Sequence, residues 1–205
     1  MLTDLGDIIT LIQCRYDRLC SMYNPEAPEI PNLKKTCVAK FRSNMDMLNT
    51  VWYYRGLLND EFISIMFDLS NMQRKTLLIT SRVKAQNSIE YKLDNYTQNH
   101  EHGEIPVNKC LNDLFGIRVV IDDDFCTQDV MNYMYENYSS YKCINSSKGT
   151  YEAVHIYFSH GNHSFPWELQ VWNKSDELNN YNSHKEYKQG YTAWEHANKE
   201  VTDCD

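Results

Sequence analysis

The stretch Ile117-Arg118-Val119-Val120-Ile121 carries the strongest strand signal in the sequence. Four of its five residues are β-branched, and such residues are typical of strands that pack in a sheet. The segments 76–80, 151–158 and 166–172 have the length and apolar content of further strands. Because these segments alternate with helical patterns, the sequence predicts an α+β fold with a mixed β-sheet of about five strands flanked by helices.

Helical periodicity dominates the chain before residue 70. Apolar residues recur at helical spacing over 5–20, and the stretch 24–31, which contains three prolines, ends this pattern. A second helical region is expected over 33–69, in more than one piece and with a break near Gly56. Its buried face is expected to contain Phe62, Ile65, Met66 and Leu69.

Three more helices are expected after residue 80. One covers 88–96 with Asn87 or Ser88 as its N-cap, and another covers 127–138. The polar segment 175–200 has aromatic and His residues at helical spacing, namely Tyr181, His184, Tyr187 and Tyr191.

The length of the chain predicts a single domain. With 205 residues and 42% hydrophobic content, the chain can bury one core and has little room for a second. We therefore expect one domain over 1–205, composed of a helical N-terminal part (1–70), a catalytic core (75–188) and a C-terminal helix (175–205).

Composition narrows the class of protein. The seven cysteines form no C-x-x-C pair, which is typical of reduced thiols in the cytosol. The N-terminus lacks the features of a signal peptide and no apolar run reaches the length of a membrane span, so a cytoplasmic protein without membrane contact is expected. A net charge of −8 argues against nucleic-acid binding driven by overall charge, although a local basic group exists at Lys34, Lys35, Lys40 and Arg42.

Two carboxylates are candidates for chemistry. Glu168 lies inside an apolar predicted strand, where its desolvation requires a metal ion or a cationic partner. A structural ion pair is an equally open interpretation of this residue. Together with Asp113, which precedes the strongest strand, Glu168 could hold Mg²⁺ on a triphosphate. Cationic side chains that could bind such a polyphosphate lie near predicted strand ends, namely Arg82, Lys84, Lys92 and Arg118. Each of them alone is more typical of an ordinary surface charge.

Several other mechanisms lack their motifs. The sequence contains no G-x-x-x-x-G-K-[ST] loop and no G-x-G-x-x-G, so a P-loop or Rossmann nucleotide site is unsupported. A motif for a Ser or Cys nucleophile and an adjacent His-Asp pair are also missing. The enzyme classes that remain use metal-assisted transfer.

Five segments in order over 81–188 resemble the RelA/SpoT-type alarmone synthetases. The family patterns that they match are R-x-K-x-x-x-S-x-x-x-K, D-[LI]-x-G-x-R, Y-x-x-x-H, E-[VIL]-Q and H-x-x-Y-K. The matching segments are Arg82–Lys92, Asp113–Arg118, Tyr151–His155, Glu168–Gln170 and His184–Lys188. The resemblance covers a little over half of the chain and implies a nucleotidyltransferase-like synthetase domain.

The resemblance also implies an activity, the transfer of pyrophosphate from ATP to a ribose 3′-hydroxyl. Asp113 and Glu168 would be the catalytic, Mg²⁺-holding residues, with Glu168 also taking the proton of the acceptor hydroxyl. ATP would be bound by Arg82, Lys84, Ser88, Lys92 and Arg118, with the two arginines on either side of adenine. The acceptor would be bound by Tyr151, His155, Gln170, His184 and Lys188. Packing in the core is the alternative interpretation of the strand aromatic Tyr151.

The acceptor is less well defined than ATP. Trp172 and Asn173 stand where the family usually has Arg and Thr, and Thr150 replaces the usual Gly. These departures favour slightly the toxic members of the family, which are encoded beside an antitoxin and modify the 3′ CCA end of tRNA, with Lys34 and Lys35 as tRNA contacts. A GTP or GDP acceptor, yielding an alarmone, or an adenine nucleotide remains an alternative. A non-catalytic nucleotide sensor or partner-binding module is the alternative from another class, and the oligomeric state stays open.

Overall fold

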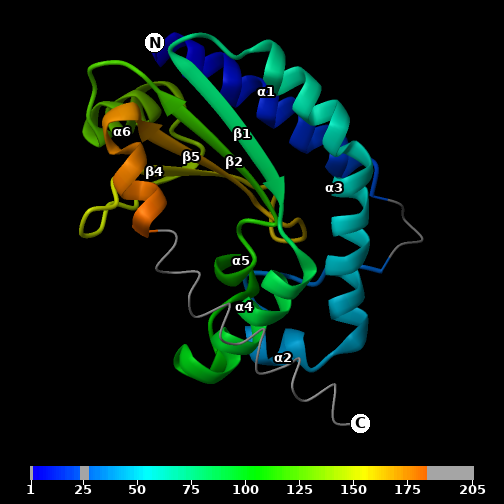
Figure 1. Ribbon diagram of the computed structural model, residues 1–205. Helices are drawn as coiled ribbons and strands as arrows, with labels where there is room; N and C mark the ends of the chain where they lie inside the picture. Colours follow the sequence, from blue (N-terminus) through cyan, green and yellow to red (C-terminus); the bar gives the residue numbers. More distant parts are fainter. Residues whose placement is uncertain (1, 24–27, 184–205) are drawn as a thin grey trace, which may run out of the picture.

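The computed structural model describes residues 2–23 and 28–183 (Figure 1). Its centre is a five-stranded sheet with the strand order β1-β2-β5-β4-β3. β2 and β5 are parallel, whereas the other neighbouring pairs are antiparallel. The predicted α+β class and the mixed five-stranded sheet are therefore confirmed. The strands are β1 Leu77–Val83, β2 Phe115–Ile121, β3 Lys142–Asn145, β4 Val154–Phe158 and β5 Trp167–Asn173.

Helices surround this sheet. They are α1 Leu2–Ser21, α2 Val38–Arg42, α3 Met45–Asn71, α4 Gln86–Asn99, α5 Val107–Cys110 and α6 Thr127–Asn137. Short 3₁₀ turns cover Glu101–Gly103 and Lys174–Asp176, and 177–183 are helical. Within the described residues, no helix combines the length and the apolar character needed to cross a membrane.

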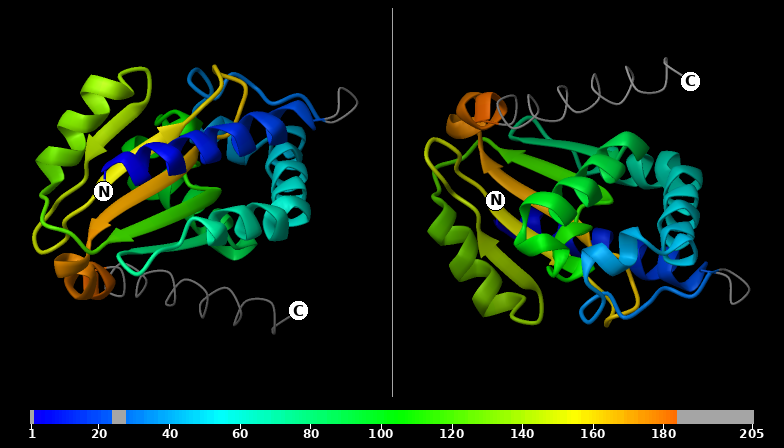
Figure 2. Two further views of the ribbon diagram at one scale, coloured as in Figure 1. Left: turned by 90° about the horizontal axis from the view of Figure 1, so that it is seen from above. Right: turned by 90° about the horizontal axis from the view of Figure 1, so that it is seen from below.

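One face of the sheet packs against α1 and α3 (Figures 1 and 2). Trp167 of β5 is fully buried at this contact, where Tyr16 of α1 meets its ring edge-on and Tyr54 of α3 accepts a 2.9 Å hydrogen bond from its indole N–H. Phe115 of β2 packs beside it with a ring-centroid separation of 4.6 Å. Because successive residues of a strand point to opposite faces, the residues that alternate with Phe115 and Trp167 along β2 and β5 face away from α1 and α3.

Helix α3 differs from its prediction. Gly56 lies inside a continuous helix. The helical region is interrupted instead at Asn44, between α2 and α3, where the Asn44 side chain accepts a 3.0 Å hydrogen bond from the Met47 N–H and caps α3. A single Gly costs a helix only about 1 kcal/mol, which the packed face of α3 offsets. Of its four expected core residues, Ile65 and Leu69 are buried, whereas the other two are half-buried.

Two other local predictions also need correction. The N-cap of α4 is Ala85, with an extended backbone and no side-chain cap, so neither Asn87 nor Ser88 caps this helix. The edge strand β3 was not predicted, because its mostly exposed residues give little hydrophobic signal. Tyr181 lies in the expected C-terminal helix, whereas the rest of that predicted helix, 184–200, falls outside the described residues.

Candidate functional site

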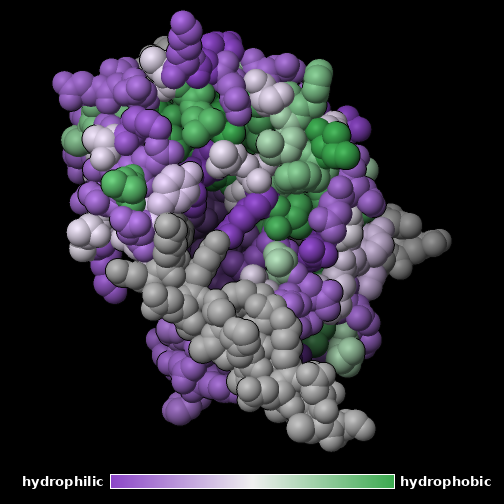
Figure 3. Space-filling view, viewed as in Figure 1, coloured by the Kyte–Doolittle hydropathy of each residue, from purple (hydrophilic) through white to green (hydrophobic). Residues whose placement is uncertain are grey.

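The face of the sheet away from α1 and α3 carries the polar side chains. Strand register aligns them, since Glu168 of β5 lies between Gly116 of β2 and Tyr157 of β4, and Gln170 lies between Arg118 and His155. Residues directly opposite in neighbouring strands point to the same face. Around this region Figure 3 shows hydrophilic side chains at a hollow in the surface. The alternation of the strands thus gathers charged and hydrogen-bonding groups on one side of the sheet.

Asp113 forms the first cluster of this site. Its Oδ2 accepts a 2.8 Å hydrogen bond from Lys84 Nζ, and its Oδ1 accepts one of 3.0 Å from Lys92 Nζ. Arg82 adds a third cation, with a nitrogen 3.9 Å from Oδ2, and its side chain is 58% exposed. Burial alone would raise the pKa of Asp113, but the charges of Lys92 and Lys84 outweigh burial and hold this pKa well below its usual range. Asp113 is therefore ionised at neutral pH within an excess of positive charge.

The backbone around this cluster is held in place. The Lys84 N–H donates to the Leu114 carbonyl at 2.8 Å, and Arg55 of α3 donates to the Lys84 carbonyl at 2.9 Å. Lys92 comes from α4, so the two lysines approach Asp113 from different elements. Ser88 lies one helical turn earlier on α4 and is half-buried. The predicted ATP-binding residues Arg82, Lys84 and Lys92 are thus brought together.

Glu168 forms the second cluster and is 7% exposed. Its Oε1 lies 3.0 Å from His155 Nδ1 and accepts a 3.1 Å hydrogen bond from the Tyr157 hydroxyl, while its Oε2 accepts one of 2.8 Å from Gln170. Burial would raise the pKa of Glu168, but the hydrogen bond and charge of His155 and the hydrogen bond of Gln170 lower it overall. The negative charge of Asp113 acts in the opposite sense on this pKa, which reflects the proximity of the two carboxylates.

A line of hydrogen bonds extends from Glu168 toward the acceptor residues. His155 Nε2 lies 2.9 Å from the Tyr151 hydroxyl, so His155 bridges Tyr151 and Glu168. Burial, despite a hydrogen bond with Trp172, raises the pKa of Tyr151 to about 12, and Tyr151 is therefore neutral at physiological pH. Tyr151, His155 and Gln170, which the sequence resemblance assigns to the acceptor, all lie in this connected group.

Arg118 is connected to Glu168 through Gln170. Its guanidinium donates to Gln170 Oε1 at 3.2 and 3.1 Å, and Gln170 in turn donates to Glu168. The guanidinium carbon lies 3.7 Å from the Trp172 ring centroid and 5.4 Å from that of Tyr181. Trp172, a departure from the family pattern, therefore packs on one face of the Arg118 guanidinium.

Tyr157 is the functional candidate that sequence reasoning missed. Its hydroxyl donates to Glu168 and lies 3.5 Å from His155 Nδ1. The two-residue period of the predicted strand 151–158 was the available signal, since it places Tyr157 on the same face as His155. No motif drew attention to Tyr157, because the family pattern ends at His155.

The remaining predicted site residues divide into two groups. His184 and Lys188 fall outside the described residues. Lys34 and Lys35 are exposed in the segment before α2, and Lys34 lines a cavity that reaches Tyr157.

The carboxylates fit Mg²⁺ in donor type. Mg²⁺ is commonly bound by one or two protein carboxylates together with substrate phosphates and water. Asp113, in the loop just before β2, and Glu168, on the neighbouring strand β5, are two ionised carboxylates. In the part of the chain that the structure describes, no group of three or more His, Cys, Asp or Glu residues could hold a metal ion. If Asp113 and Glu168 are the protein ligands, phosphate oxygens and water would complete the coordination of the ion.

Comparisons with known proteins give structural neighbours only. No protein-family model matches the sequence, and no curated protein matches it. Among solved structures, the chain is similar to small alarmone synthetase 1 from Bacillus subtilis, with 14% identity, a TM-score of 0.41 and coverage of 78% of this chain and 96% of that one. It is also similar to a GTP pyrophosphokinase family protein from Streptococcus pneumoniae, with 15% identity, a TM-score of 0.40 and coverage of 72% and 77%. Small alarmone synthetase 2 from Bacillus subtilis gives 18% identity, a TM-score of 0.39 and coverage of 70% and 81%. At such low identities and TM-scores, the function of this chain has to be inferred from its own side chains.

Proposed function

We propose that this chain is an ATP-dependent pyrophosphokinase of the RelA/SpoT type, which transfers the β,γ-pyrophosphate of ATP to a ribose 3′-hydroxyl. The observation that carries the proposal is the presence of two buried, ionised carboxylates, Glu168 on β5 and Asp113 just before the neighbouring β2, with three cations around Asp113. Four of the five family-like segments contribute residues to this face. Charge of both signs in one hollow is what transfer of a highly charged group requires.

The donor side consists of the cations around Asp113. Lys84 and Lys92 would hold the phosphates of ATP, and Arg82, which is exposed, would reach the adenine together with Arg118. Mg²⁺ bound by Asp113 and Glu168 would neutralise charge that develops on the transferred phosphates. Lys84 and Lys92 both contact Asp113, so their ammonium groups lie beside the carboxylate that would hold Mg²⁺, and this supports their proposed role in binding the phosphates of ATP.

The acceptor side centres on Glu168. A new bond would form between the acceptor O3′ and the β-phosphorus, the bond from that phosphorus to the α,β-bridging oxygen would break, and AMP would leave. The lowered pKa keeps Glu168 ionised at neutral pH, so its carboxylate can accept the 3′-hydroxyl proton. Hydrogen bonds from Tyr157, Gln170 and His155 fix its orientation. Tyr151 would stack on the acceptor base.

The proposed acceptor is the 3′ CCA end of tRNA, which would make the chain a translation-blocking toxin with a cognate antitoxin. The departures at Thr150, Trp172 and Asn173 support this choice over GDP or GTP. An alarmone synthetase that uses GDP, GTP or an adenine nucleotide is the second candidate, because the Glu168 cluster itself suits any ribose hydroxyl.

The test is a transfer assay with purified protein, Mg²⁺ and ATP labelled on its terminal phosphate, with tRNA, GDP, GTP and ATP offered as separate acceptors. Label on tRNA supports the proposed acceptor, and label on a nucleotide supports the second candidate. Glu168→Gln should transfer no label, whereas Glu136→Gln, on the exposed surface of α6, should be as active as wild type. ATP binding without label on any acceptor contradicts the proposal and indicates a non-catalytic nucleotide-binding module.

A further inference from the structure

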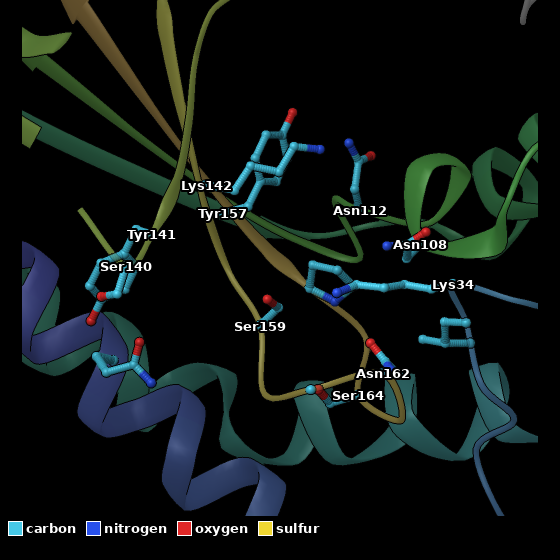
Figure 4. A pocket seen from close by; sticks show the side chains of 14 residues that line it. Lys34, Asn108, Asn112, Ser140, Tyr141, Lys142, Tyr157, Ser159, Asn162 and Ser164 are labelled. Carbon is cyan, nitrogen blue, oxygen red and sulfur yellow. The ribbon is translucent and has the colours of Figure 1, made fainter. Parts of the chain in front are cut away.

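A cavity of about 510 Å³ lies beside the predicted active site (Figure 4). Its wall is assembled from segments far apart in the sequence: the segment before α2, the α5 region, the start of β3 and the connection between β4 and β5. Lys34 and Lys142 reach into it from different sides in Figure 4. Gln13 of α1 and Tyr157 of β4 also line it, so the shape of the cavity depends on the whole fold.

The lining of this cavity has a positive charge. Lys34 and Lys142 contribute ammonium groups, and none of the lining residues is Asp or Glu, although the whole chain has a net charge of −8. Among the residues that the structure describes, neither lysine forms an ion pair. Side-chain amides and hydroxyls surround the two charges, including those of Asn108, Asn112 and Ser159. Two ammonium groups without carboxylates, together with neutral donors, favour a phosphate-sized anion.

The segment that carries Lys34 is fixed by hydrogen bonds. The Leu33 N–H donates to the Asn162 carbonyl at 2.8 Å, and the Leu33 carbonyl accepts from the Asn108 N–H at 3.1 Å. Asn32 Oδ1 accepts from the N–H groups of Lys34 and Lys35 at 3.2 and 3.1 Å. Lys34 lines the cavity, whereas Lys35 does not. The two adjacent lysines therefore have different surroundings.

The cavity adjoins both clusters of the predicted active site. Tyr157 lines it and donates to Glu168 from the same side chain. Lys142 Nζ lies 5.1 Å from the Tyr157 ring centroid. Asn112 also lines it and accepts a 3.3 Å hydrogen bond from Lys92. Tyr151 precedes β4, His155 and Tyr157 lie on it, and Ser159 follows it in the cavity. An acceptor held at Tyr151 and Glu168 would therefore continue toward Lys142 and Lys34.

We propose that this cavity binds a phosphate group of the acceptor nucleotide through Lys34 and Lys142, and that Lys35 takes no part. The inference rests on the proposed function, because it assigns a second contact point to the acceptor of that reaction. The phosphate could belong to GDP or GTP, or to the backbone near the 3′ end of tRNA, and both offer the same chemistry to two ammonium groups.

The experiment measures equilibrium binding of GDP, guanosine, tRNA and ATP to the full chain by titration calorimetry. The variants are Lys34→Gln and Lys142→Gln, with Lys35→Gln as the matched control and circular dichroism as the check on folding. Each cavity variant should weaken binding of a phosphate-bearing acceptor about tenfold, the effect of losing one charge-assisted hydrogen bond. Binding of ATP should be unchanged, and Lys35→Gln should behave as wild type. A selective loss with GDP assigns the site to a free nucleotide, and a selective loss with tRNA assigns it to the tRNA backbone.

Three results would overturn the proposal. One is equal binding by all three variants, another is a loss confined to ATP, and the third is a wild-type protein that binds GDP no better than guanosine and binds no tRNA. The binding assay needs no turnover, so it separates the two proposals. If wild type binds the acceptor through Lys34 and Lys142 but transfers no label, the pyrophosphokinase assignment fails and the phosphate site stands.

Discussion

The Tyr157 hydroxyl donates a 3.1 Å hydrogen bond to Glu168 Oε1, and the two residues face each other directly across β4 and β5. The strand pairing fixes their separation, so the orientation of the buried carboxylate is a property of the sheet. Tyr157 also lines the cavity that contains Lys34 and Lys142. It therefore connects the proposed general base with the proposed acceptor site.

Tyr157→Phe should lower the rate of pyrophosphate transfer by about tenfold, since a hydrogen bond to a charged group contributes about 1.5–3 kcal/mol. Loss of this donor should also raise the pKa of Glu168, so the acid limb of the pH–rate profile should move to higher pH. Steady-state transfer between pH 4 and pH 9 measures both effects. Tyr135→Phe, in a side chain that is 80% exposed, is the control. An unchanged rate and an unchanged pH–rate profile for Tyr157→Phe would show that Tyr157 has no role in the reaction.

Asp113→Asn should destabilise the fold as well as abolish activity. The substitution leaves the ammonium groups of Lys84 and Lys92 close together without a counter-charge, and breaking such a buried pair costs about 3–5 kcal/mol. The free energy of unfolding, measured in urea for wild type and Asp113→Asn, gives this loss of stability. The double variant Asp113→Asn/Lys92→Met should recover part of it, whereas Asp60→Asn, exposed on α3, should unfold as wild type does. A double variant no more stable than Asp113→Asn would argue against repulsion as the cause.

The acid stability of the protein should depend on the same carboxylates. The pKa values of Asp113 and Glu168 are lowered in the folded protein, so their contribution is complete above the unfolded-state carboxyl pKa of about 4 and is lost as pH falls below it. The free energy of unfolding, measured in urea at a series of pH values, should fall in this acid range. Asp113→Asn should show a shallower fall than wild type, and parallel curves would contradict the assignment.

Gln170→Glu should impair transfer by acting on Glu168. The new carboxylate would still pair with Arg118, but it would replace the amide that donates to Glu168 with a like charge. The pKa of Glu168 should then rise, and the acid limb of the pH–rate profile should shift upward with it. Gln128→Glu, exposed on α6, adds the same charge at a distance and should leave the profile unchanged.

The strand pattern predicted most of the site. The predicted strands 117–121 and 166–172 correspond to the central strands β2 and β5, and their two-residue period places Arg118, Glu168 and Gln170 on one face. The lysine pair on Asp113 comes from other segments, with Lys84 just after β1 and Lys92 on α4. The pairing of Tyr157 with Glu168 depends on the register of β4 against β5, which the sequence does not reveal.

Other features depended on tertiary contacts. The continuity of α3 through Gly56 is decided by packing, because propensity alone favours a break there. The different environments of Lys34 and Lys35 follow from hydrogen bonds to residues more than 70 positions away. Sequence adjacency suggested one basic patch, whereas the fold places one lysine in the cavity and leaves its neighbour outside.

The last strand of the sheet in sequence, β5, is inserted between β2 and β4. In the folded protein β1 pairs with β2 and β3 pairs with β4, and β5 alone joins these two antiparallel pairs. Before β5 is synthesised, the two pairs have no strand to join them. Glu168 lies on the joining strand itself, so the second carboxylate arrives only when the two halves meet. In a nascent chain on the ribosome, the proposed catalytic carboxylates are therefore not both present until β5 has emerged.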